Sequence, residues 1–260
     1  MDQNTNSFDA LYNDAHEHRP LMRWDELLAF VRRFPQLAAF NAALIAQQRP
    51  TATFVETEDG WRERFGRSVE ADATSMVILH PFGPVRFVYD IADTTGPELP
   101  TEVSTPFAAV GAPTWDGLHL VVATLRRKNL LPEHLPQTRS ASVMLTRLLT
   151  ELALIYSGHR GSRPELAVSA ADPHVERSQV RFETECITWL IAGRIGLRAA
   201  ATGSLKGYLK HGELMPPVSR DRVLHTVNAI ERLFGGALAF GTAVRHEMPS
   251  LFDLDEQLAV

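Results

Sequence analysis

The chain has 260 residues, of which 45% are hydrophobic and 22% charged, with a formal net charge of −5. These values are close to the norm for a globular protein and allow a sizeable core, and the acidic balance counts against non-specific nucleic-acid binding. No stretch reaches the roughly 18 apolar residues of a membrane span, and the polar N-terminus has no signal-peptide pattern. The single cysteine, Cys186, excludes an internal disulfide and a thiolate metal cage. We therefore expect a cytoplasmic protein without a membrane partner.

The first part of the chain predicts helices that lead into a small sheet. Residues 1–20 have the polar composition of a flexible arm. Over residues 24–48 apolar side chains recur every three or four positions, which predicts helical structure, and Pro35 predicts a division into two helices. The β-branched and aromatic residues of 51–57 favour a strand. Residues 61–69 then have the pattern of a short connecting unit.

Residues 76–79 and 85–89 predict the two strands of an antiparallel hairpin, with Gly83-Pro84 in its turn. The four prolines of residues 94–115 predict a long loop or linker. Beyond it, apolar periodicity predicts helices at residues 116–128, 141–156, 175–197, 204–210 and 219–233. Helices at both ends with a small sheet between them define an α+β fold.

The order FNAALIAQQRPTATFV…W…GRSV…MVILHPF…FVYD, within residues 24–93, resembles the N-terminal domain of ArdC-type antirestriction proteins. In that family the domain is linked to single-stranded DNA binding. The resemblance makes Trp61 and Arg67 candidate nucleic-acid contacts, and Arg62 and Arg64 could add to a local basic face.

The segment LTELALIYSGH, starting at Leu148, resembles the signature HELAHxxxGH of ImmA/IrrE-type zinc metallopeptidases. The later segments FETECITWLIAGRIGL and YLKHGELMPPVSRDRVLHTVNAIERL resemble the helix that supplies that family's third zinc ligand and its C-terminal helices. The resemblance implies a zincin-like domain. Known members act on repressor proteins of mobile elements and on stress regulators.

In such enzymes two imidazoles one helical turn apart hold the zinc, and the adjacent glutamate activates a zinc-bound water. On the signature, Thr150 and Leu154 stand where the two histidines belong. Glu151 stands at the general base, His159 closes the motif, and Glu183 stands at the third ligand. Leucine cannot coordinate zinc, and a threonine hydroxyl is a poor ligand beside imidazole. We therefore predict a vestigial pocket of these five residues, with no cofactor, no metal and no peptidase activity.

The predicted organisation has four parts: the arm (1–20), an ArdC-like domain (21–95), a linker with a connecting helix (96–140) and a degenerate metallopeptidase-like domain (141–260).

Glu183 and Glu185 are two residues apart on a helix, so at most one of them faces the vestigial pocket. The family resemblance implies a strand before the signature helix, whose edge pairs with an extended substrate. Residues 116–145 show no clear strand pattern, so we expect an extended peptide to find less backbone to pair with.

Three functions remain open. The first is a non-catalytic relative of the peptidases that binds a protein partner, such as a repressor, a toxin or a defence protein. The second is an antirestriction-like protein that binds single-stranded DNA through residues 24–93. The third is a peptidase with an unusual ligand set, formed by Glu151, His159 and Glu183.

Overall fold

A computed structural model describes residues 22–35, 37–80, 83–99, 113–131, 135, 137–197 and 199–233. The arm predicted for residues 1–20 lies outside them. The described residues form two compact units, an N-terminal unit up to residue 99 and a C-terminal unit from residue 113. They hold eight α-helices and two small antiparallel sheets, so the predicted α+β fold is confirmed. No helix among them is long and apolar enough to cross a membrane.

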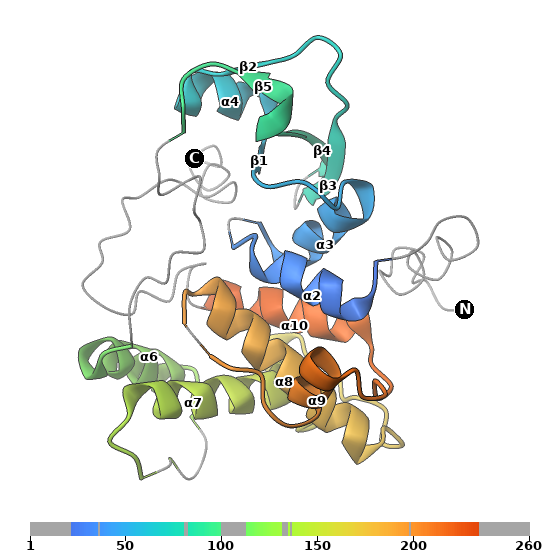
Figure 1. Ribbon diagram of the computed structural model, residues 1–260. Helices are drawn as coiled ribbons and strands as arrows, with labels where there is room; N and C mark the ends of the chain where they lie inside the picture. Colours follow the sequence, from blue (N-terminus) through green and yellow to red (C-terminus); the bar gives the residue numbers. More distant parts are fainter. Residues whose placement is uncertain are drawn as a thin grey trace. The chain divides into compact units, whose positions relative to one another are not determined.

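The N-terminal unit packs two helices beside a three-stranded sheet (Figure 1). Its elements are α2 (Trp24–Arg32), α3 (Ala39–Gln48), β1 (Val55–Glu56), α4 (Glu58–Phe65), β2 (Ser68–Val69), β3 (Met76–His80), β4 (Gly83–Asp90), η1 (Ile91–Asp93) and β5 (Thr94–Thr95). β4 lies between β1 and β3, and β2 pairs with β5 in a second sheet. The predicted hairpin is confirmed, but Gly83 and Pro84 belong to β4 rather than to the turn.

Residues 61–69, predicted to be a connecting unit, instead form most of helix α4 and strand β2. The Thr57 hydroxyl accepts a hydrogen bond from the Gly60 amide at 3.0 Å and caps the start of α4. Gly66 ends the helix in the left-handed conformation, with φ 62°. Trp61 is fully buried in the apolar cluster beneath this helix.

Two amide side chains of α3 bond to the backbone of β3. Asn41 donates to the Leu79 carbonyl and accepts from the Leu79 amide, both at 3.0 Å. Gln48 donates to the Val77 carbonyl at 2.8 Å and accepts from the Val77 amide at 2.7 Å. The two side chains thus take the place of a neighbouring strand, and they protect this edge of the sheet from pairing with another chain.

The C-terminal unit is helical, and α8 packs against α7, α9 and α10 (Figure 1). Its helices are α6 (Trp115–Arg127), α7 (Ala141–Tyr156), η2 (Pro164–Leu166), α8 (Arg177–Arg194), α9 (Gly203–His211) and α10 (Arg220–Leu233). The five predicted α-helices are all present, and α6 belongs to this unit although the linker was predicted to contain it. The Arg194 guanidinium donates to both carboxylate oxygens of Glu231, at 2.6 and 3.0 Å, and joins α8 to α10.

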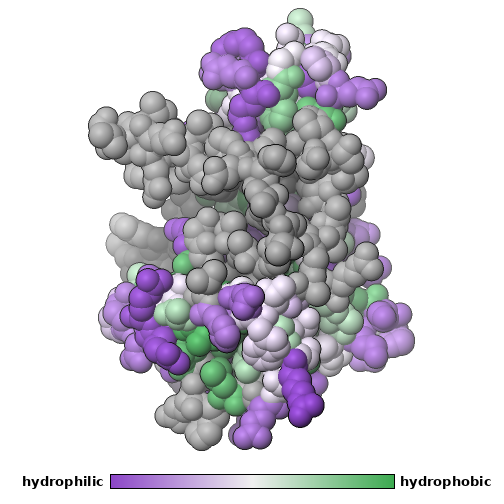
Figure 2. Space-filling model, turned by 90° about the vertical axis from the view of Figure 1, so that its left-hand side faces the viewer, coloured by the Kyte–Doolittle hydropathy of each residue, from purple (hydrophilic) through white to green (hydrophobic). Residues whose placement is uncertain are grey.

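Large apolar side chains also reach the surface. The most exposed among the described residues are Leu79, Val85, Phe87, Trp115, Leu135, Val143 and Leu214. Figure 2 shows one face of the chain, on which apolar side chains lie beside hydrophilic ones. Such mixing is ordinary for a globular surface.

Candidate functional site

Helix α7 carries the motif that resembles the zinc-peptidase signature. Thr150 and Leu154 lie one turn apart on it, are both half-buried, and line the same groove. The Thr150 hydroxyl donates to the Thr146 carbonyl at 2.8 Å, so its proton already forms a hydrogen bond within the helix. The structure therefore brings together the two positions at which the resemblance would require imidazoles.

The groove has a volume of about 500 Å³, within the range of known ligand sites. It lies along α7 and α8 and is bounded by the segment that follows α8. Its walls include Thr146, Thr150 and Leu154 from α7 and Val180, Thr184 and Glu185 from α8. Like Thr150, Thr146 and Thr184 donate their hydroxyl protons to carbonyls in their own helices, at 2.9 and 2.7 Å. The groove surface is therefore mainly apolar.

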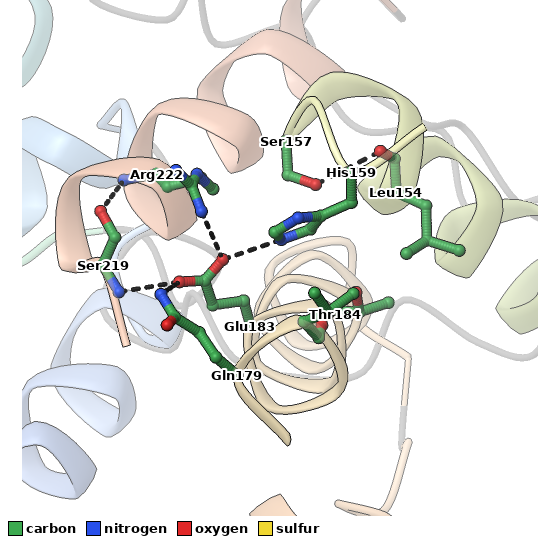
Figure 3. Close-up of polar contacts among 9 residues, drawn as sticks. Leu154, Ser157, His159, Gln179, Glu183, Thr184, Ser219 and Arg222 are labelled. Atoms are coloured by element: carbon green, nitrogen blue, oxygen red, sulfur yellow. Dashed lines mark hydrogen bonds and ion pairs between the residues drawn. The ribbon is translucent and has the colours of Figure 1, made fainter. Parts of the chain in front are cut away.

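Glu183 lies on another face of α8 and does not line the groove. Figure 3 shows it pointing toward His159 and Arg222, while Leu154 and Thr184 lie to the other side. His159 Nε2 lies 2.9 Å from Glu183 Oε2, with side chains 3% and 0% exposed. Oε1 accepts from the Gln179 side chain and from the Ser219 amide, both at 2.8 Å. Arg222 Nη1 completes the cluster 3.3 Å from Oε2. We call these five residues the Glu183 cluster.

The Glu183 cluster holds a buried negative charge. Burial alone would raise the pKa of Glu183, but hydrogen bonds from His159, Gln179 and Ser219, with the charge of Arg222, outweigh it and lower that pKa. Donation from His159 to the Glu183 carboxylate requires the imidazole proton on Nε2. The cluster thus ties the end of α7 to α8 and to the start of α10.

Glu151, which stands at the general-base position, lies neither in the groove nor in the Glu183 cluster. Both its oxygens accept from Arg160, each at 2.9 Å, and the two side chains are 22% and 54% exposed. The hydrogen bond to Glu151 raises the pKa of Arg160. The five residues predicted to form one pocket therefore divide among the groove, the Glu183 cluster and this surface pair. The alternative ligand set of Glu151, His159 and Glu183 is not assembled.

The side chains at the groove do not fit a catalytic zinc. The carboxylate that shares the groove with Thr150 and Leu154 is Glu185. Its oxygens already accept from the Arg181 side chain and from the Leu205 amide, each at 2.9 Å. Across the described residues, no three His, Cys, Asp or Glu side chains come together as a metal site requires.

Sequence reasoning missed three members of the Glu183 cluster. Gln179 had a local signal, because it precedes Glu183 by four residues on the same helix. Ser219 and Arg222 had none, because their contact with Glu183 depends on how α10 packs against α8.

Three of the four predicted nucleic-acid contacts are held within the N-terminal unit, and the fourth, Arg62, forms an exposed ion pair. Trp61 is 0% exposed, and its indole N–H donates to the Tyr89 carbonyl at 3.0 Å. It offers no ring face on which a base can stack. The three predicted arginines are also engaged: Arg62 with Asp59, Arg64 with Glu56, and Arg67 with Thr94 and the carbonyls of Gly96 and Pro97.

Comparison with protein-family models, with curated proteins and with solved structures finds no match. The likeness to ArdC-type and ImmA/IrrE-type proteins therefore rests on the sequence segments alone.

Proposed function

We propose that the chain is a non-catalytic, zincin-like protein that binds a segment of a regulatory or defence-related protein in the groove between α7 and α8. The observation that carries this proposal is the groove itself. It opens on the face of α7 where the resemblance would place the metal ligands, and Thr150 and Leu154 line it.

The chemistry of the groove supports binding rather than hydrolysis. A peptidase needs an activated water and a group that stabilises the developing oxyanion. The carboxylate at the base position, Glu151, is paired with Arg160 outside the groove. The groove carboxylate, Glu185, is held by Arg181 and the Leu205 amide. The base position therefore lies outside the groove, and the groove carboxylate already joins two parts of the fold.

The surface of the groove supports an apolar ligand. Leu154, Val180 and Trp189 provide its larger apolar side chains, and Ala199 and Ala200 leave room above them. Burying apolar side chains of a partner here would contribute roughly 25 cal/mol per Å² of area removed from water. A helix or a turn suits this site better than an extended strand, because the unit's only described β pairing is the isolated bridge between Arg163 and Val168.

The test is capture of a partner by the full chain from its native cell extract, followed by reconstitution with the purified partner. Ala200→Trp fills the groove from an exposed position, and Lys206→Trp on α9 adds the same side chain at an exposed position outside it. We expect Ala200→Trp to abolish binding and Lys206→Trp to preserve it. Equal binding by both variants would refute the proposal. So would stoichiometric zinc in the purified protein together with cleavage of the partner.

A further inference from the structure

The walls of the groove are basic as well as apolar. Arg147 from α7 and Arg177 and Arg181 from α8 all line it. Arg181 is paired with Glu185 at 2.9 Å, which cancels one positive and one negative charge. Among the described residues, Arg147 and Arg177 have no hydrogen-bond or ion-pair partner. The groove therefore keeps two uncommitted positive charges, one on each helical wall, although the whole chain is acidic at −5.

We infer that the groove recognises an acidic amphipathic helix, with an apolar stripe flanked by carboxylates. This inference rests on the proposed function and names the chemistry of the partner segment. The stripe would lie against Leu154, Val180 and Trp189, and flanking Asp or Glu side chains would reach Arg147 and Arg177. Guanidinium groups bind carboxylates in a planar, two-bond geometry, so each arginine selects an acidic side chain over a neutral one.

The test uses three labelled peptides of about four helical turns each. All three carry leucine on one face, and the other face carries glutamate, glutamine or lysine. Binding to the full chain is followed by fluorescence anisotropy at low and high salt. We expect the glutamate peptide to bind about fivefold more tightly than the glutamine peptide, the effect of two solvent-exposed ion pairs. High salt should reduce that preference, because it screens exposed charges.

Charge reversal at the two arginines provides the decisive comparison. In Arg147→Glu/Arg177→Glu the preference should invert, so that the lysine peptide binds best. The matched control, Arg126→Glu/Arg127→Glu, changes the charge equally at the exposed end of α6 and should keep the preference for glutamate. Equal binding of the glutamate and lysine peptides to the unaltered chain would overturn the inference, as would a preference that survives reversal at Arg147 and Arg177.

The peptides also separate this inference from the proposed function. If the glutamine peptide binds as well as the glutamate peptide and Ala200→Trp abolishes both, the groove holds protein segments without selecting acidic ones. The inference then fails while the proposed function stands. If none of the three peptides binds the unaltered chain but the purified partner does, the inference fails and the proposed function stands; if neither the peptides nor any partner bind, both are refuted.

Discussion

Glu183→Ala is expected to destabilise the C-terminal unit strongly, because it removes the shared acceptor of a buried polar cluster. Glu183 is 0% exposed, and its oxygens accept from His159, Gln179 and the Ser219 amide, with Arg222 3.3 Å away. The substitution leaves these donors around a cavity without an acceptor. Of these groups the Arg222 side chain, 25% exposed, can regain water, whereas the His159 side chain, 3% exposed, cannot do so in place.

The magnitude follows from the partners that are left behind. Breaking a buried charged pair costs about 3–5 kcal/mol, and a buried neutral donor without a partner costs about 1–3 kcal/mol. Because Arg222 is partly exposed and can regain water, we expect a loss of about 4 kcal/mol. Glu183→Gln keeps an oxygen for the Ser219 amide but turns an NH₂ group toward His159 or Arg222, so we expect about 2 kcal/mol.

Urea unfolding followed by circular dichroism measures the total effect, and hydrogen exchange of the Ser219 amide reports on the C-terminal unit alone. The second readout is needed because a chain with two compact units need not unfold in one step. Glu151→Gln is the control, since it breaks a surface pair worth about 0.5 kcal/mol. If Glu183→Ala lowers the free energy of unfolding no more than Glu151→Gln does, the account of the cluster is refuted.

The same carboxylate predicts a pH dependence. The folded protein lowers the pKa of Glu183 below its unfolded value of about 4.3. A lowered pKa stabilises the fold at pH values above the unfolded pKa, and this contribution disappears as pH falls through the folded pKa. The difference in unfolding free energy between the unaltered chain and Glu183→Gln should therefore be constant above about pH 5 and shrink in more acidic solution. A difference that grows on acidification would contradict the ionised state of Glu183.

Two further sets of substitutions test the backbone contacts. Gly158→Ala should cost about 3 kcal/mol or more, because Gly158 has φ +77° and a Cβ there would lie 2.2 Å from the Ser169 carbonyl oxygen. Thermal unfolding measures this cost, and an unchanged midpoint would contradict the close approach of the two backbones. Asn41→Ala should cost about 2 kcal/mol and Gln48→Ala, which is more exposed, about 1 kcal/mol, as measured by urea unfolding. Both variants should also aggregate faster, since each frees part of the β3 edge.

The sequence predicted the C-terminal helices well because the longer ones carry an apolar period, and because glycines follow three of them, Gly158, Gly196 and Gly212. It predicted the N-terminal helix pair for the same reason, with Pro35 between the two helices. Helix α4 was missed because its EDGWRERF sequence has few apolar residues and no stripe. The sequence signals of this helix lie at its two ends, where Thr57 caps the start and Gly66 takes the left-handed conformation. Such end signals are weaker evidence for a helix than apolar periodicity.

The site was harder to predict than the fold. Spacing placed Thr150 and Leu154 on one face, and the structure agrees, because an i, i+4 pair on a helix always shares a face. Spacing could not decide whether Glu183 or Glu185 meets that face, since this depends on the rotation of α8 against α7. The structure places Glu185 there and turns Glu183 toward His159. The rotation of α8 about its axis is set by packing across the whole unit, so it leaves no local pattern in the sequence.

Rebuilding the two missing imidazoles tests that rotation directly. Thr150→His/Leu154→His puts two nitrogen donors one turn apart at the groove, and zinc at about 100 times its dissociation constant should stabilise this variant by about 2.7 kcal/mol. Thermal unfolding with zinc and with a chelator measures the gain, and Thr150→His alone is the control. Adding Glu185→Gln should weaken zinc binding, because Glu185 lines the groove. Adding Glu183→Gln should leave the zinc dissociation constant unchanged, because Glu183 faces His159. The opposite result would place the third ligand where the sequence resemblance puts it and would refute the division between the groove and the Glu183 cluster.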